Sequence, residues 1–365
     1  MTGGARTGEK RPALTLATLN LYHWAAPPLG WYGPDEGHSE ASWAAKRLWL
    51  AEILREMDAD VVGFQEVVSV EALREDCAAA GYPYLAAVAE PAIREARADP
   101  GAPAPERAAF YRRPVNAVAA RFPITTAPAR VHPALPKALG LAADRDFRRP
   151  VVRAEIEAPG VGPVLVYCAH LKSPGVSERD APMQGLETPP EDAAVRARWS
   201  LEGLSRAAAY AMIQRMFEAT ALQHAAMADI AAAPERPVAL LGDLNDTPES
   251  AALQALTPFA AFERDGGAEV AAAAPIGGDP SADLYRLVDA ARLAARDLRS
   301  DARAPTHRAG ASGEAIDHII VSRALRGGPL QLSAYTVHDS HFRGGDPAQS
   351  SDHAGVSARF SLMDQ

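Results

Sequence analysis

The chain has 365 residues, a length that fits one large layered domain or two modest ones. Hydrophobic residues make up 48% of it and charged residues 23%, so it has the composition of a folded protein with a real core, not of a disordered chain. The net charge of −9 excludes a protein that coats nucleic acid through bulk positive charge, so any contact with phosphate must be local.

Three features of the sequence predict a cytoplasmic protein. The first twenty residues contain no apolar segment typical of a signal peptide. Every apolar stretch is interrupted by a polar or charged residue before it is long enough to cross a membrane, so no membrane span is expected. Cys77 and Cys168 each lie in an apolar run, which indicates core packing in a reducing compartment and not a disulfide.

The first half of the chain alternates strands and helices. A strand is expected over 14–21, and after a loop rich in proline and glycine the apolar spacing predicts a helix with Ser42 as its N-cap. The run VVGFQE over 61–66 predicts a buried strand with an exposed polar end, and Ser69 precedes a second helix. Further strands are expected around 109–111, 115–120, 151–156 and 164–170.

The second half continues the same pattern. After a long polar loop, an alanine-rich helix is expected over 192–233 with a break near Gly203. The run PVALLGDLNDTPES predicts a buried strand, a loop and a new helix with Thr247 as its N-cap. Strands are expected near 315–322, 330–337 and 354–360. We therefore predict one α/β domain over 1–365, with insertions near 22–41, 91–106, 172–192 and 263–282.

Polar side chains capable of chemistry end or interrupt six of these apolar runs. They are Asn20, Gln65 with Glu66, His170, Asp243 with Asn245, Asp317 with His318, and Asp352 with His353. Taken alone, each has an ordinary structural explanation, since Asp and Asn after a strand are common turn formers. Together they favour one cleft at the strand ends, where loops bring side chains from distant segments together.

The sequence at these places resembles the endonuclease/exonuclease/phosphatase superfamily. The matching stretches TLN, FQEV, AHLKS, GDLN, IDHIIVS and SDH occur in the family's order and cover nearly the whole chain. The resemblance implies an α/β four-layer sandwich of two packed mixed β-sheets flanked by helices, with the site at one edge of the sheets. It also implies hydrolysis of a phosphoester that depends on Mg²⁺ or Mn²⁺.

Metal binding is expected from oxygen ligands at three of these positions. Glu66 and Asn20 offer the carboxylate and amide oxygens that Mg²⁺ prefers. The resemblance makes Glu66 the principal ligand and lets Asp352 support the metal or its waters. A bound ion would polarise a phosphoryl oxygen and steady the leaving oxygen.

The remaining polar groups are expected to handle protons and charge. By the resemblance, Asp317 orients His353, Asp243 aligns the attacking water, and His170 donates to the scissile phosphate or the leaving group. The amide of Asn245, like that of Asn20, would donate to nonbridging oxygens. The general base is left open between Asp243 and His353.

Several neighbours of these residues are assigned with less support from the pattern. Lys172 and Ser173 of HLKS are expected to contact substrate, as in the nuclease-like branches that this stretch resembles. His318 should point away from the cleft, because successive strand residues face opposite sides. His338 and His341 are expected in a solvated loop.

The sequence therefore predicts a metal-dependent phosphodiesterase, nuclease-like, whose partner is a phosphoester substrate that can be a nucleic acid. No obligatory protein partner is readable. The alternative enzyme is a phosphatase for a small phosphorylated metabolite or an inositol phosphate. A binding protein that keeps the fold without activity is a third class, disfavoured because no expected polar position is lost.

Overall fold

A computed structural model describes residues 13–31, 36–95, 109–135, 145–174, 191–258, 280–298, 304–309, 312–343 and 346–363. Most of the predicted insertions at 91–106, 172–192 and 263–282 lies outside these residues. None of the helices in the described ranges has the length and apolar character that a membrane span needs.

Two six-stranded mixed sheets form the centre of the molecule. The first contains, in spatial order, β16 (Leu330–His338), β17 (Gly355–Leu362), β1 (Leu14–Trp24), β3 (Val61–Val67), β7 (Val115–Ala120) and β4 (Tyr84–Ala86). The second contains β12 (Val288–Asp289), β15 (Asp317–Val321), β11 (Val238–Asp243), β10 (Gly162–His170), β9 (Val152–Ala158) and β8 (Ala129–Arg130). Smaller sheets join β2 (Gly30–Trp31), β6 (Ala109–Arg113) and β5 (Ala92–Glu95), and β13 (His307–Ala309) with β14 (Ser312–Glu314).

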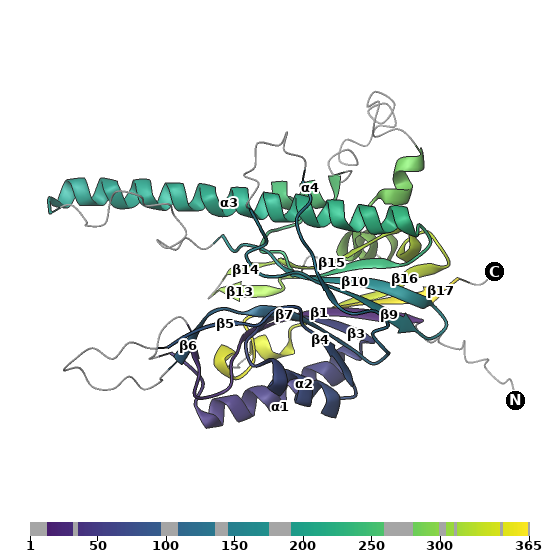
Figure 1. Cartoon of the computed structure of the whole chain (residues 1–365), viewed down its shortest axis with the longest axis horizontal. Coiled ribbons are helices and arrows are strands. Elements are labelled where there is room, and N and C mark those ends of the chain that lie inside the picture. The colour runs from purple at the N-terminus through teal and green to yellow at the C-terminus, as the bar shows by residue number, and fades with distance from the viewer. Residues whose placement is uncertain are drawn as a thin grey trace, which may run out of the picture.

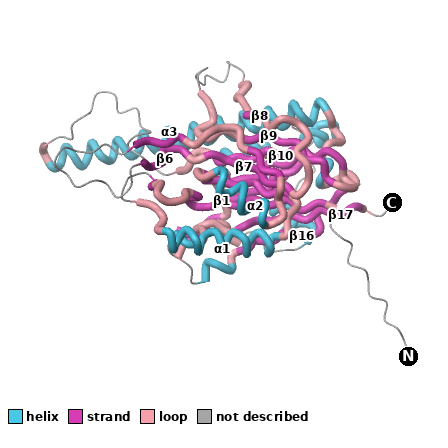
Figure 2. The backbone as a smooth tube through the Cα atoms, turned by 60° about the horizontal axis from the view of Figure 1, so that its bottom comes forward, coloured by secondary structure: helices cyan, strands magenta, loops and turns pink. Residues whose placement is uncertain are grey.

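Helices cover the outer face of each sheet, so the molecule has four layers, as predicted (Figure 1). The first sheet is covered by α1 (Glu40–Met57) and α2 (Val70–Ala79), and the second by α3 (Ala193–Ala232) and α4 (Ala251–Leu256). The short α6 (Ala290–Leu293) packs beside β15 and β16. Figure 2 shows the strands stacked between the helices of the two outer layers.

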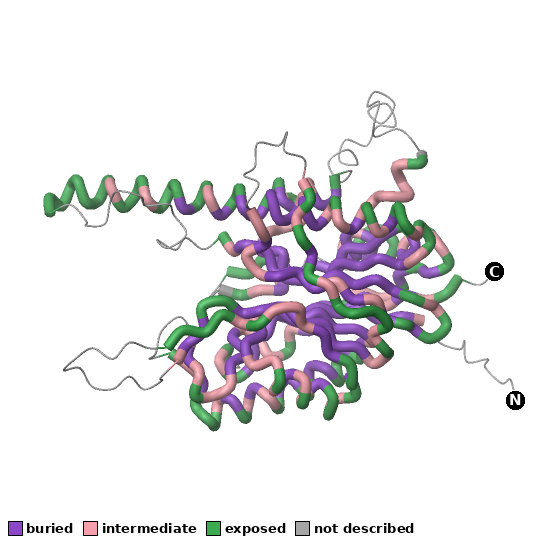
Figure 3. The backbone as a smooth tube through the Cα atoms, in the orientation of Figure 1, coloured by how far each residue is buried: buried purple, intermediate pink, exposed green. Residues whose placement is uncertain are grey.

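Apolar side chains fill the three spaces between these layers. The cluster between the sheets includes Leu16, Val166 and Leu241, none of which is exposed to solvent. A second cluster packs Phe64 of the first sheet against Leu50 of α1, and a third packs the second sheet against α3 and α4. The buried backbone lies in the middle layers, whereas the projecting end of α3 is exposed (Figure 3). Both cysteines are buried and free, as predicted.

Two helix starts and one helix interior differ from the sequence prediction. Helix α1 begins three residues earlier than predicted, with Ser39 as its N-cap, because Ser39 and Ser42 cap each other reciprocally. Helix α4 begins after Ser250, not Thr247, since the Ser250 side chain accepts from the Leu253 backbone N–H. Helix α3 continues through Gly203, whose cost of about 1 kcal/mol relative to alanine is too small to break a long helix.

Candidate active site at the strand ends

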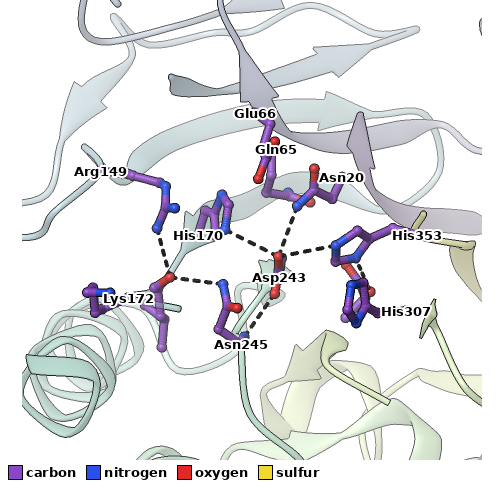
Figure 4. Close-up of polar contacts among 12 residues, drawn as sticks. Asn20, Gln65, Glu66, Arg149, His170, Lys172, Asp243, Asn245, His307 and His353 are labelled. Atoms are coloured by element: carbon purple, nitrogen blue, oxygen red, sulfur yellow. Dashed lines mark hydrogen bonds and ion pairs between the residues drawn. The ribbon is translucent and has the colours of Figure 1, made fainter. Parts of the chain in front are cut away.

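The predicted polar residues meet where the two central sheets end on the same side. Asn20 is paired with Gln65 in the parallel contact of β1 with β3. His170 and Asp317 both pair with Asp243, from β10 and β15 on either side of β11. The Asn20 amide Nδ2 then donates to Asp243 Oδ2 at 2.9 Å, which joins the two sheets across the gap between them. Figure 4 shows the side chains of Asn20, His170 and His353 converging on Asp243.

Asp243 is the centre of the cluster. It is buried, its Oδ1 accepts from the Asn245 backbone N–H at 2.9 Å, and its Oδ2 lies 3.2 Å from His170 Nε2 and 3.8 Å from His353 Nε2. Burial raises the pKa of this carboxyl to about 6, a shift that His353 opposes and Asp317 reinforces. Asp243 can therefore exchange a proton near neutral pH.

A single glycine lets β11 lie close enough to β10 to place Asp243. A Cβ on Gly242 would lie 1.9 Å from the Ala169 carbonyl oxygen, a distance that no side chain tolerates. The GDLN stretch therefore needs a glycine at 242 so that the backbones of β11 and β10 can approach closely, and this approach positions the carboxylate of Asp243.

His353 is held by a buried carboxylate. Its Nδ1 lies 2.9 Å from Asp317 Oδ2, and the Thr306 hydroxyl donates to that same oxygen at 2.7 Å. Burial alone would lower the pKa of His353, but the carboxylates of Asp317, Asp243 and Asp352 outweigh it and raise the pKa to about 10. The predicted Asp317–His353 pair is therefore present in the structure, and Nε2 of the ring faces Asp243.

His170 differs from His353 in its electrostatic surroundings. Burial lowers the pKa of His170 well below its ordinary value, and the positive charges of Arg149, His353 and Lys172 lower it further. Among the described residues, no partner lies within hydrogen-bonding distance of its buried Nδ1. A neutral imidazole next to Asp243 can accept a hydrogen bond at one nitrogen and donate one at the other.

A strand irregularity turns Glu66 toward the site. The regular pairing of β1 with β3 stops at Asn20–Gln65 and resumes at Trp24–Val67. Glu66 has a left-handed backbone with φ of 59°, as do Tyr22 and His23 opposite it. Such bulges re-aim side chains near active sites. The His23 backbone N–H donates to Glu66 Oε2 at 3.1 Å, whereas Gln65 is fully buried between the sheets.

The other sequence-predicted residues lie at the edge of this cluster. The side-chain amide of Asn245 donates to the Leu171 carbonyl, not to a group that faces Asp243. Lys172 is buried, its ammonium donates to the Ser173 carbonyl at 2.9 Å, and Figure 4 shows it away from Asp243. Substrate contact by Lys172 and Ser173 therefore remains a prediction.

Three histidines outside the cluster have structural contacts. His318 points away from Asp243, as the strand alternation predicts, and its Nδ1 lies 2.6 Å from Asp289 Oδ2. The expected solvated loop for His338 and His341 is wrong. His338 ends β16 in a buried position beside Glu56, and His341 Nε2 donates to the His353 carbonyl at 3.0 Å.

Sequence reasoning missed several residues that hold the site in place. Glu218 of α3 is buried and accepts from the backbone N–H groups of Arg148 and Lys172, both at 2.7 Å. Thr306 orients Asp317 as described above. Lys46 is fully buried on α1 and donates to the Ser350 carbonyl at 2.5 Å. Its spacing from Trp43, Leu50 and Ile53 places it on the apolar face of that helix, which is the signal that could have found it.

Comparison with known proteins agrees with this geometry. A model of the endonuclease/exonuclease/phosphatase family matches residues 33–353. The human Nocturnin catalytic domain is 15% identical over 97% of both chains, with a TM-score of 0.53. A family protein from Bacteroides thetaiotaomicron is 14% identical over 96% of this chain and 98% of its own, with a TM-score of 0.52. TDP2 from Caenorhabditis elegans is 15% identical over 96% of this chain and 75% of its own, with a TM-score of 0.50.

No curated protein sequence matches the chain. At 14–15% identity the solved structures establish the shared fold alone. The family match is stronger, because it extends over most of the sequence and includes every stretch from FQEV to SDH. The chain therefore belongs to the endonuclease/exonuclease/phosphatase family, whose members hydrolyse phosphoester bonds.

Proposed function

We propose that the chain is a divalent-metal-dependent phosphodiesterase of the nuclease-like kind, which hydrolyses its substrate by direct attack of water. The observation that supports this most strongly is the continuous set of contacts from Asn20 through Asp243 to His353 and Asp317. These contacts support the proposal because a phosphate bound at this end of the two sheets would meet hydrogen-bond donors, a proton acceptor and carboxylates together.

The residues available for a metal fit Mg²⁺ or Mn²⁺. Glu66, Asn20 and Asp352 supply carboxylate and amide oxygens, the ligand type that these ions prefer. Among the described residues, Asp352 Oδ1 is buried without a hydrogen-bond partner, which is costly unless a cation or water satisfies it. A divalent ion bound there would neutralise charge on a phosphoryl oxygen and on the leaving oxygen.

The protein's own groups would orient water and carry the proton. We assign Asp243 as the acceptor for the proton of the attacking water, because the carboxylates around His353 raise its pKa to about 10 and keep the ring protonated. With Nε2 turned toward Asp243, a protonated His353 would stabilise negative charge on the phosphate. His170, on the other side of Asp243, would donate to a nonbridging oxygen or to the leaving group.

Activity of the purified chain on three substrates tests the proposal. Supercoiled plasmid and a bis-aryl phosphodiester report diester cleavage, and inorganic phosphate released from sugar and inositol monophosphates reports phosphatase activity. We expect diester cleavage with Mg²⁺ or Mn²⁺ that EDTA abolishes. Preferential release of inorganic phosphate would favour the phosphatase, and no turnover of any substrate with either ion would reject a catalytic role.

A variant pair ties the activity to the site. We expect Asp243→Asn to lower turnover by roughly 10²–10⁴-fold, the usual loss for a proton-transfer group, with folding preserved because the amide has nearly the same shape. Asp60→Asn is the matched control, since Asp60 precedes β3 at the end opposite Glu66 and accepts from the Thr15 backbone N–H. Equal loss in both variants would point to destabilisation instead of chemistry.

A further inference from the structure

Two histidines from separate segments lie side by side at the edge of the site. The Arg308 backbone N–H donates to the Asp352 carbonyl and the Ala354 N–H donates to the Thr306 carbonyl, so these bonds flank an antiparallel bridge between His307 and His353. Residues opposite each other in a bridge flanked in this way have the closest side chains in a sheet. The two imidazole rings are accordingly 4.6 Å apart, centroid to centroid.

A carboxylate completes a group of three metal-ligand types. His307 Nε2 lies 3.7 Å from Asp352 Oδ2, and His353 Nε2 lies 3.9 Å from Asp352 Oδ1. One ligand atom from each of the three residues lies within 4.8 Å of the others. The side chains of His307 and Asp352 are 23% and 21% exposed, so an ion could enter from solvent, whereas His353 is buried.

The orientation of the His353 ring suits a metal ligand, and Zn²⁺ bound at Nε2 would displace the proton that this nitrogen otherwise carries. Asp317 engages Nδ1, and the Thr306 hydroxyl fixes that carboxylate. A carboxylate on one imidazole nitrogen, with the other nitrogen free to coordinate, is the usual arrangement around histidines that bind zinc. The nearest carboxylate oxygens to His353 Nε2, on Asp243 and Asp352, are 3.8 and 3.9 Å away, which exceeds hydrogen-bonding distance.

We propose that His307, Asp352 and His353 form a second cation site that binds Zn²⁺ through two imidazole nitrogens and one carboxylate oxygen, and that Zn²⁺ bound there inhibits hydrolysis. Two nitrogen ligands favour zinc over Mg²⁺, which prefers oxygen. Ligand atoms on one tetrahedral zinc ion are about 3.4 Å apart, so the three ligand atoms, which lie within 4.8 Å of one another, would move closer together when zinc binds. Inhibition rests on the proposed function, because it requires His353 Nε2 in the reaction; binding does not.

Direct zinc binding tests the site independently of activity. The chain is stripped with EDTA, the chelator is removed, and Zn²⁺ is titrated in competition with a chromophoric chelator; Co²⁺ then reports nitrogen ligation through its visible absorption. We expect His307→Gln to weaken Zn²⁺ binding at least tenfold and to abolish the Co²⁺ band. Glu66→Gln should leave both unchanged. His224→Gln is the matched control, since His224 is exposed on α3.

The outcomes separate this site from the proposed function. Wild-type zinc affinity in His307→Gln, or loss of zinc binding in Glu66→Gln alone, would overturn the site. If zinc binding depends on His307 while no phosphoester is hydrolysed, the site stands and the proposed function fails. If hydrolysis occurs, we expect Zn²⁺ to inhibit the wild type in the presence of Mg²⁺ and His307→Gln to retain activity at the same Zn²⁺ concentration. Equal inhibition of both proteins would overturn the inhibitory role.

Discussion

The buried lysine beside the site leads to a sharp prediction about stability and pH. Lys46 is fully buried, and its ammonium lies 5.7 Å from the ring centre of Tyr22 and 5.9 Å from that of Trp49. Burial lowers the pKa of Lys46 from 10.5 to about 7, even though Asp352 and Glu66 act to raise it. We predict that Lys46→Met removes a pH-dependent cost from the folded state.

The sign follows from proton uptake in the two states. Unfolded, Lys46 stays protonated up to about pH 10.5, whereas the folded chain releases that proton near pH 7. Between these values the unfolded state binds more protons, so the free energy of unfolding rises with pH. The cost to the folded state is about 4 kcal/mol at pH 7 and falls to about 1 kcal/mol at pH 10.

Urea denaturation of the wild type and of Lys46→Met, in EDTA at several pH values, measures this difference. The difference in free energy of unfolding between the variant and the wild type should shrink by about 3 kcal/mol between pH 7 and pH 10, as the wild type loses the cost of its buried lysine. Methionine also removes the hydrogen bond to the Ser350 carbonyl, which lowers the stability of the variant by roughly 1–3 kcal/mol. This loss changes the size of the stability difference between the two proteins but not its dependence on pH. A difference between the two proteins that does not change with pH would refute the reasoning.

Three other substitutions test how the site is built. Gly242→Ala should destabilise the fold by several kcal/mol, measured by urea denaturation, because its Cβ would overlap the Ala169 carbonyl; a shift under about 1 kcal/mol would contradict this. Glu218→Ala should cost roughly 1–3 kcal/mol and speed hydrogen exchange at the Arg148 and Lys172 amides; unchanged exchange there would remove Glu218 from its positioning role. Mg²⁺ at ~100 times its Kd should stabilise the wild type by about 2.7 kcal/mol in thermal unfolding, whereas Glu66→Gln should gain much less, and equal gains would exclude Glu66 as a ligand.

Much of the architecture could be predicted from the sequence, because the signals are local. Alternating apolar runs locate strands and helices, and the polar ends of those runs identify Asn20, His170 and Asp243. The order of six short stretches indicates the family fold, which the two packed sheets confirm. Even the outward direction of His318 follows from the alternation of one strand.

What the sequence left undetermined involves contacts between segments far apart in the chain. Strand alternation predicts which face a side chain occupies, but not which side chain of the opposite sheet it will meet. The bond from Asn20 to Asp243 spans 223 residues, and the pairing of His307 with His353 depends on how two loops meet at the sheet edge. Lys46 shows the same limit. The spacing of apolar residues predicts which face of the helix it occupies, but not that its partner is the Ser350 carbonyl, 304 residues away. Packing between layers decided these contacts, since it alone brings such distant backbone segments within hydrogen-bonding distance.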